Sequence, residues 1–284
     1  MRKILLAVTG MLALLSLHAQ DVVDGSASSV AMHFSRYTRN TEALSMGGTD
    51  VHARLNRIFA GRTLDAIAGY QAWGPSLATS SRDIIVDVHG SVSPKLNVSA
   101  ALALDSGRNY SSRDLSLRLG ASYQFNLLYA GAAVKYYRSV LTSDEALSAV
   151  AGDAWVAARF GGFSAATGVS NIGSSVQGFS LPSSLYVSAG YYAPIGSDYS
   201  FRTAFQTDWF FYGAVSSGVG VEFGAFSIVY ARAGYHFGSQ AAVGPSYASV
   251  GIGLKYGGVK LDAAYLFASE ALGGTMQYTV GYEF

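Results

Sequence analysis

Apolar and polar side chains alternate through most of this chain, and the last ten residues show the pattern most clearly. One side of that segment carries Met276, Tyr278, Val280, Tyr282 and Phe284, and polar or small residues fill the other side. Successive side chains of a strand point to opposite faces of a sheet. The segment therefore predicts a strand with one apolar and one polar face. A chain made of many such strands must place its apolar faces against lipid or in a dry core.

About fourteen segments share this alternation, each near the roughly 9–11 residues that a tilted membrane strand needs. The predicted strands are 64–73, 82–93, 96–105, 113–125, 128–138, 148–160, 162–171, 183–193, 199–210, 214–223, 226–237, 247–257, 259–267 and 275–284.

The connections between these segments alternate between tight joints and longer links rich in Ser and Gly, with one short exception at 211–213. The joints are Pro94-Lys95, Asn126-Leu127, Gly161-Gly162, Pro194 to Asp198, Gly224-Ala225 and Gly257-Gly258. The longer links are 74–81, 106–112, 139–147, 172–182, 238–246 and 268–274. Short turns at one end and longer loops at the other predict an all-β fold, an antiparallel transmembrane barrel. Both chain ends are then expected on the periplasmic side with the short turns. A β-sandwich gives no reason for such one-sided spacing.

In a soluble barrel the apolar faces of the strands would point inward. In this chain the polar faces carry charges in many strands, so we expect the polar faces to line a partly wet lumen. The candidate lumen charges are Arg118, Lys135, Arg159, Arg202, Glu222, Arg232, His236, Lys255 and Asp262. These side chains either select a solute or form balanced ion pairs that hold a filled barrel, and we favour the ion pairs. Arg232 and His236 lie four residues apart on one inward face. They are the strongest cationic feature of a pore, unless Arg232 pairs with Glu222 on the next strand.

The first residues have the pattern of an export signal. Two basic residues precede an apolar run from Ile4 to Leu17, which is too short for a confident membrane-spanning helix, and small Ala19 follows. We expect residues 1–19 to be a cleaved signal peptide, with an anchor helix as the alternative. The expected location is the outer membrane of a Gram-negative bacterium, with its lipids and the barrel assembly machinery as partners.

The alternation is interrupted from 20 to 63, ahead of the barrel segment 64–284. This stretch is predicted to be a lead and a hatch that packs in the barrel or at its mouth, and a surface loop is an equal alternative. Within it we expect a short strand at 30–34 and a short helix at 51–59.

Composition excludes several classes of function. The chain has no Cys, which rules out a lipoprotein anchor, disulfides and thiol chemistry. Its formal net charge of +1 becomes about −1 without Arg2 and Lys3, so nothing favours nucleic-acid binding. No phosphate loop, dinucleotide fingerprint or metal-spaced cluster is present, and we expect no cofactor and no metal. His33 and Ser35 would share one strand face, but that spacing is common by chance, so we expect no enzyme.

The longer links hold at most eleven residues, fewer than large adhesins usually need. The link at 172–182 contains the most apolar material: Ile172, Val176, Phe179 and Leu181. It is a candidate for contact with a partner protein, although a loop folded down onto the barrel rim is the favoured interpretation.

Several segments together resemble a known family. The terminal strand, with Tyr282 and Phe284, is similar to the last strand of bacterial outer-membrane barrels, where the final aromatic residue belongs to the assembly signal. The other matching segments are Ala43-Leu44-Ser45-Met46-Gly47-Gly48, Tyr70-x-x-Trp73, Ser170-Asn171-Ile172-Gly173, Leu181-Pro182-Ser183-Ser184-Leu185, Arg232-Ala233-Gly234-Tyr235, Gly251-Ile252-Gly253-Leu254-Lys255-Tyr256 and Leu261-Asp262-Ala263-Ala264-Tyr265. In this order they resemble the PorV/PorQ family of Bacteroidetes outer-membrane proteins, which is related to FadL-like barrels.

The resemblance implies a non-enzymatic component or adaptor of type IX protein secretion and surface attachment, with translocon or cargo proteins as partners. The alternative that it implies is a FadL-like or porin-like transporter of small solutes, hydrophobic ones included. The chain departs from the family after the Met-Gly-Gly turn. The family usually has an Asn-Pro-Ala segment there, whereas residues 54–61 contain no proline, which puts fatty-acid conduction in doubt.

Overall fold

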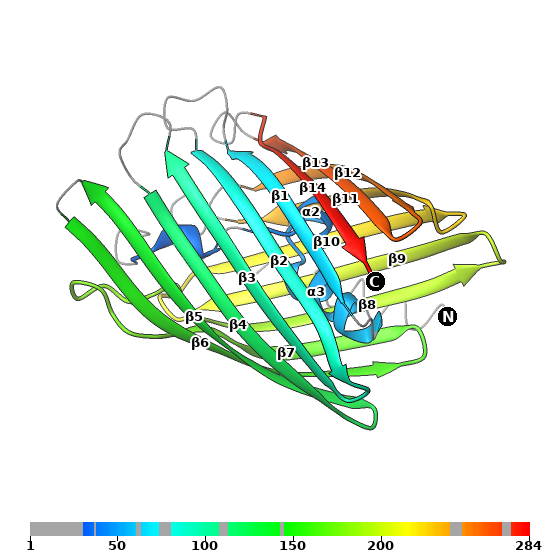
Figure 1. The fold of residues 1–284 in the computed structure, drawn as a ribbon, viewed down its shortest axis with the longest axis horizontal. Helices are drawn as coiled ribbons and strands as arrows, with labels where there is room; N and C mark the ends of the chain where they lie inside the picture. The colour runs from blue at the N-terminus through cyan, green and yellow to red at the C-terminus, as the bar shows by residue number, and fades with distance from the viewer. Residues whose placement is uncertain are drawn as a thin grey trace.

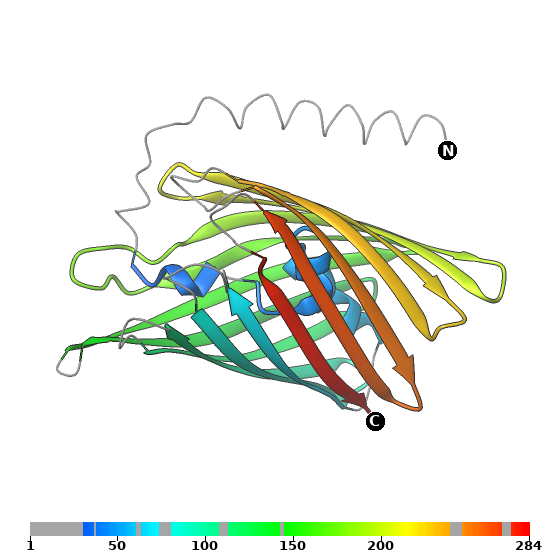
Figure 2. The same cartoon turned by 90° about the horizontal axis from the view of Figure 1, so that it is seen from above.

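A closed barrel of antiparallel strands forms almost the whole described part of the chain (Figures 1 and 2). The computed structural model describes residues 31–36, 38–60, 64–73, 81–107, 113–142, 145–238, 246–268 and 274–284. Within these ranges the strands are β1 (Asp65–Trp73), β2 (Ser81–Ser93), β3 (Leu96–Gly107), β4 (Arg113–Phe125), β5 (Leu128–Thr142), β6 (Glu145–Phe160), β7 (Phe163–Gly173), β8 (Ser184–Ile195), β9 (Tyr199–Phe210), β10 (Val215–Ala225), β11 (Val229–Phe237), β12 (Tyr247–Tyr256), β13 (Val259–Ala268) and β14 (Met276–Glu283). The predicted fold class and each predicted strand are confirmed.

The barrel closes between its first and last strands. β1 pairs with β14 from Asp65 opposite Glu283 to Ala72 opposite Met276. The amide of Phe284 extends this pairing by donating to the carbonyl of Leu64 at 2.9 Å. Closure satisfies backbone groups that an open sheet edge would expose to lipid, at a cost of several kcal/mol each.

The two faces of the sheet are those that the alternation predicts. On β14, Tyr278 and Val280 are 51% and 50% exposed, whereas Gln277 and Thr279 are 0% and 8% exposed. On β12, Ile252 is 52% exposed and Ser249 is 2% exposed. Large apolar side chains therefore cover the outside of the barrel, and polar side chains point into the lumen.

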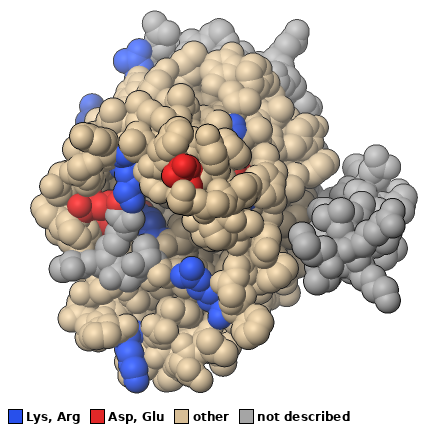
Figure 3. Space-filling model, turned by 90° about the vertical axis from the view of Figure 1, so that its right-hand side faces the viewer, with Lys and Arg blue, Asp and Glu red and all other residues tan. Residues whose placement is uncertain are grey.

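Two rims differ in their connections. At the turn rim, on the right of Figure 1, strands meet in short turns such as Asn126-Leu127 and Gly257-Gly258. The loop rim at the other end carries the remaining links. Figure 3 looks at the turn rim, where charged side chains stand singly or in small groups on a mostly uncharged surface.

Some predicted joints were misplaced. β10 continues through the predicted joint Gly224-Ala225, and the turn is formed by Phe226 to Ile228, with Phe226 and Ser227 at φ 54° and 55°. Pro194 belongs to β8, and the turn follows at Gly196 to Asp198. At the loop rim, β5 and β6 run into the predicted link at 139–147. These joints were predicted from glycine and proline. The turn at 226–228 contains neither residue, whereas Pro194 and Gly224 lie inside strands.

The lumen is filled by the segment that precedes the barrel. Its helices are α2 (Thr41–Ser45) and α3 (Asp50–Ala60), both enclosed by strands in Figure 2. α2 packs against β11, β12, β13 and β14, and α3 packs against β8 and β9. We call Thr41–Ala60 the plug. The predicted helix at 51–59 is confirmed as part of α3. No described helix has the length and apolar character to span a bilayer.

The first described residues lie at the loop rim, opposite the start of β1. Met32 and Phe34 pack there against Tyr137, Val176 and Leu181. The predicted strand at 30–34 is wrong, because Met32 has φ 54° and the 3-10 helix η2 (His33–Arg36) follows it. The strand face expected for His33 and Ser35 is therefore absent. The start of β1 and the end of β14 lie together at the turn rim, whereas residues 31–36 lie at the loop rim. Which rim is periplasmic stays a prediction. The predicted signal peptide falls outside the described residues.

Candidate functional site in the barrel lumen

The turn between α2 and α3 sits against a bare part of the wall. Asn40 caps α2 by accepting a hydrogen bond from the amide of Ala43 at 3.0 Å, and the chain then turns through Met46-Gly47-Gly48. Gly47 has φ +71°, and a Cβ there would lie 2.5 Å from the carbonyl oxygen of Tyr235. Only glycine fits this left-handed position at so close an approach.

The wall beneath the turn also lacks side chains, which lets the two backbones meet. A Cβ added at any of four inward glycines would overlap atoms of Ser45, Met46 or Gly47. These glycines, which we call the glycine seat, are Gly218, Gly220, Gly234 and Gly251.

Polar contacts beside the glycine seat fix the same turn. Ser249 Oγ accepts from the amide of Gly47 at 3.1 Å, and His236 Nδ1 lies 3.2 Å from the carbonyl oxygen of Gly47. The ring of His236 stacks on Tyr247 with centroids 4.8 Å apart. His236, a predicted pore cation, therefore holds the plug.

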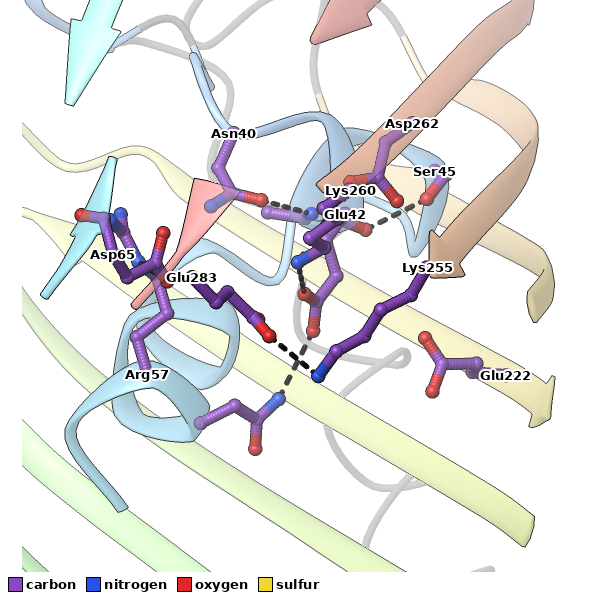
Figure 4. Close-up of polar contacts among 12 residues, drawn as sticks. Asn40, Glu42, Ser45, Arg57, Asp65, Glu222, Lys255, Lys260, Asp262 and Glu283 are labelled. Atoms are coloured by element: carbon purple, nitrogen blue, oxygen red, sulfur yellow. Dashed lines mark hydrogen bonds and ion pairs between the residues drawn. The ribbon is translucent and has the colours of Figure 1, made fainter. Parts of the chain in front are cut away.

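Glu42 of α2 is the centre of the contacts between plug and wall (Figure 4). Its carboxylate accepts from Arg202 at 2.6 Å, lies 3.5 Å from Lys260 Nζ, and accepts from the Asn56 amide at 3.2 Å. Burial alone would raise the pKa of Glu42, but Arg202 and Lys260 outweigh burial and hold it well below its ordinary 4.5. The charged carboxylate is thus stable in the lumen only because the wall supplies cations.

The wall continues this cluster across neighbouring strands. Glu222 lies opposite both Arg202 and Arg232 in register, and accepts from them at 2.5 and 2.6 Å. Arg232 also donates to Asp262 at 2.6 Å. This pair lies over Gly253 of the intervening strand, where a Cβ would come within 2.6 Å of the Asp262 carboxylate. With Glu42 and Lys260, three cations face three carboxylates. We call these six residues the charge network. Arg232 is 2% exposed and is bound on both sides, so it faces no open pore.

The apolar side of α3 closes the lumen toward β5 to β8. Val51, Leu55 and Ile58 pack with Trp155 and Tyr186 in one buried cluster. Such burial stabilises by roughly 1.5–3 kcal/mol for each large aliphatic side chain.

His52 packs on the wall beside this cluster. A Cβ at Gly190 would overlap its ring, which shows how closely α3 approaches β8. Burial, aided by Arg202, lowers the pKa of the His52 imidazole to about 4, so the ring is neutral at pH 7.

The polar side of α3 pairs with β1, β2 and β6. Arg57 lies 3.0 Å from both Asp65 and Asp87. Arg54 pairs loosely with Asp50 at 3.8 Å and with Asp153 at 3.9 Å.

Asp153 occupies a β-bulge where the register of β6 and β7 shifts. Asn171 stands in the bulge at φ 57°, and its amide donates to Asp153 at 3.0 Å. The Asn171 side-chain oxygen accepts from Lys135 at 2.9 Å and from Tyr137 at 2.8 Å. Lys135 also lies 2.7 Å from Asp153. The Ser-Asn-Ile-Gly segment thus shapes the wall and carries a polar network into the lumen.

Two cavities lie on either side of α3 and share no lining residue. The loop-side chamber measures about 260 Å³ and is bordered by Arg54, Arg118, Lys135 and Tyr186 among others. The turn-side vestibule measures about 490 Å³ and is bordered by His52, Arg159, Tyr192 and Arg202 among others. The plug therefore divides the lumen into two compartments.

The remaining predicted residues lie apart from the charge network. Arg159 faces the vestibule, where Nη1 donates to the carbonyl of Phe59 at 3.4 Å. Lys255 pairs with Glu283 at 2.6 Å near the turn rim. Tyr282 and Phe284 are exposed on the outer face with rings 4.6 Å apart, and their role in assembly stays a prediction.

The link after β7 folds down onto the loop rim, as favoured from the sequence. Val176 and Leu181 are 6% and 2% exposed within the cluster around Phe34 and Tyr137. Phe179 is 47% exposed, so part of the link faces outward.

Glu42, Asp153 and the glycine seat were not predicted from the sequence. Glu42 lies outside the alternating strands, so no periodicity places it. The seat could have been found from its spacing, because glycines recur on the inward positions of three successive strands.

Comparisons with known proteins agree with this architecture. The toluene transporter TbuX of Ralstonia pickettii aligns with 88% of this chain and 99% of its own, at 12% identity and a TM-score of 0.61. The outer membrane protein Omp33 of Acinetobacter baumannii aligns with 79% of this chain and 100% of its own, at 11% identity and a TM-score of 0.54. No protein-family model matches the chain. No curated protein sequence matches it either. The fold is therefore that of outer-membrane β-barrels.

Proposed function

We propose that this protein is an outer-membrane barrel that carries a small solute through its lumen, with the plug as the barrier. The observation that carries this is the pair of cavities on opposite sides of α3, each lined by polar and aromatic side chains. A barrel with a purely structural role would have no reason to keep two solvated compartments. The likeness to a toluene transporter supports small-solute passage in general.

The plug must move, at least locally, for a solute to pass. α2 is held by the charge network and the glycine seat, whereas the polar side of α3 is held partly by pairs at 3.8–3.9 Å. We therefore place the moving part in α3 and the fixed part in α2.

A solute-flux assay tests the proposal. Purified barrel in liposomes should admit small solutes faster than empty liposomes, and a disulfide between His52→Cys on α3 and Gly190→Cys on β8, where a Cβ would overlap the His52 ring, should slow that flux. Reduction should restore the flux. A barrel that admits no solute, or whose flux ignores the crosslink, would contradict transport through a moving α3.

A second candidate function is an adaptor for type IX secretion, as the resemblance to the PorV/PorQ family implies. The specific observation in its favour is exposed apolar surface at the loop rim, where Phe179 and Phe211 are 47% and 64% exposed. Translocon or cargo proteins would dock there without chemistry in the lumen.

Deletion and complementation separate the two functions. An adaptor requires that a deletion strain lose surface attachment of type IX cargo, and that Phe179→Ser with Phe211→Ser fail to restore it. Normal cargo attachment in the deletion strain would eliminate the adaptor. The transporter predicts that this double variant keeps full solute flux.

No enzymatic role is proposed. No group of His, Cys, Asp and Glu among the described residues has the arrangement of a metal site.

A further inference from the structure

The loop-side chamber presents more cations than carboxylates. Its lining includes three carboxylates, Asp50, Asp87 and Asp208. Five cationic side chains border the same space: Arg39, Arg54, Arg57, Arg118 and Lys135. The surface that a solute would touch therefore carries a positive excess.

The excess is concentrated at Asp153, behind the chamber wall. Lys135 alone pairs closely with this carboxylate, at 2.7 Å, whereas Arg54 and Arg118 each lie 3.9 Å from it. Three cations thus share one carboxylate that is 2% exposed. The other partner of Arg54 is Asp50, at 3.8 Å and 44% exposed, which is a weak pair.

Two polar atoms of the chamber make no hydrogen bond within the described ranges: Nε of Arg118, and Nε2 of His89, which is only 5% exposed. The acceptor that faces Arg118 Nε is Asp153 Oδ2, which lies 3.9 Å away, too far for a hydrogen bond, and makes no other. Both residues border the chamber. A buried polar atom without a hydrogen bond is unfavourable. One acceptor that reaches Arg118 Nε and, in its Nε2–H tautomer, His89 Nε2 would satisfy both atoms.

The acidic groups of the chamber are engaged elsewhere. Asp87 pairs with Arg57, which Asp65 also binds, both at 3.0 Å. Asp208 accepts from the Gln206 amide at 2.8 Å. Asp87 and Asp50 stabilise the charge of Arg118 only at longer range, and among the described residues none of these three carboxylates forms an ion pair with it.

We propose that the loop-side chamber binds a small organic anion whose carboxylate lies between Arg118 and His89. Arg118 and Lys135 supply charge, and Ile85, Ala101 and Ala103 offer an apolar wall to the remainder of the molecule. A volume of about 260 Å³ holds on the order of ten heavy atoms. This inference rests on the proposed transport function and names its substrate class.

Calorimetric titration of the full-length barrel in detergent tests the site. Benzoate is the probe, benzamide is its neutral counterpart of the same shape, and benzylamine is its cationic counterpart. We expect benzoate to bind at least tenfold more tightly than either, because charge-assisted hydrogen bonds to Arg are roughly twice as strong as neutral ones. Equal binding of benzoate and benzamide, or no binding of benzoate, overturns the proposal without any variant.

Matched variants locate the site. Arg118→Gln should weaken benzoate binding about tenfold or more and leave benzamide unchanged, since the lost hydrogen bonds are to a charged group. Arg159→Gln is the control, because it removes an inward cation that borders only the vestibule. Equal losses in the two variants would show non-specific attraction and overturn the site.

Flux measurements keep this proposal separate from the transport function. Benzoate that binds in the chamber but never crosses the liposome wall would refute transport and leave the site intact. Faster flux of neutral or cationic solutes than of benzoate, with no anion binding, would refute the site and leave transport intact.

Discussion

Glu42 of the plug lies 2.6 Å from Arg202 of the wall, although 160 residues separate them in the chain. Both side chains are nearly buried, at 8% and 13% exposure, and the pair belongs to a network of three cations and three carboxylates. Such a network is stable only when it is complete, because each ion removed leaves a buried charge without compensation. The plug is therefore a required part of the lumen, not a loop that happens to enter it.

Neutralising Glu42 should release α2. In Glu42→Gln, Arg202 and Lys260 lose their plug carboxylate, and breaking a buried pair in this way typically costs about 3–5 kcal/mol. We expect frequent conductance steps in planar bilayers where the unaltered barrel shows few. Asp50→Asn is the control, since Asp50 is 44% exposed and its pair with Arg54 is 3.8 Å long. Identical traces from the two variants would show that the charge network does not hold the plug.

Acid should loosen the docked plug. Docked His52 has a pKa of about 4, against an ordinary 6.5, so a released plug binds more protons between these values. Its contribution to docking is fully present above pH 6.5 and is lost as the pH falls toward 4, a change of up to about 3 kcal/mol. The pKa of docked Glu42 is lowered, so its contribution to docking is likewise lost as the pH falls below its ordinary 4.5.

Conductance recorded between about pH 7 and pH 5 checks this, because only His52 of the two titrates in that window. Channel opening should rise as the pH falls, and His52→Gln should flatten the rise. A slope that His52→Gln leaves unchanged would assign the acid response to another group.

The barrel could be predicted from the sequence because its signal repeats. Lipid-facing apolar residues such as Val280 and Ile252 recur at every second position of a strand. One position that departs from the pattern therefore changes the predicted strand little. Turn boundaries were harder, since Phe226 and Ser227 adopt positive φ without being glycine.

The lumen could not be predicted to the same depth. Register determines which charges meet: Glu222 contacts Arg202 and Arg232 because the three lie directly opposite across β9, β10 and β11. Pairing with Glu222 was therefore foreseeable once the strands were aligned. Docking of Glu42 depends on a helix outside the repeating pattern, whose position only the folded barrel determines.

Filling the glycine seat should expel the turn that it accommodates. A Cβ in Gly234→Ala would overlap the backbone of Met46 and Gly47, and overpacking of this kind costs about 1–3 kcal/mol. Limited trypsin digestion checks this, because Arg54 and Arg57 on α3 are protected while the plug is docked. We expect faster cleavage in Gly234→Ala. Gly152→Ala is the matched control, since its Cβ would meet nothing closer than 3.7 Å. Equal protection from trypsin in both variants would show that the barrel wall can shift to accept a Cβ, so that docking of the plug does not require glycine at position 234.

The outer face should tolerate no charge at mid-strand. Ile252 lies near the middle of β12 and is 52% exposed, so Ile252→Arg would place a guanidinium in lipid. We expect a loss of roughly 2–4 kcal/mol in the free energy of unfolding, measured by guanidinium denaturation in vesicles. Ser164→Arg is the control, because Ser164 faces the solvated vestibule and an added charge there stays hydrated. If the inward variant were the more destabilised of the two, the assignment of the apolar face to lipid would be wrong, and the barrel would have to bury that face against protein.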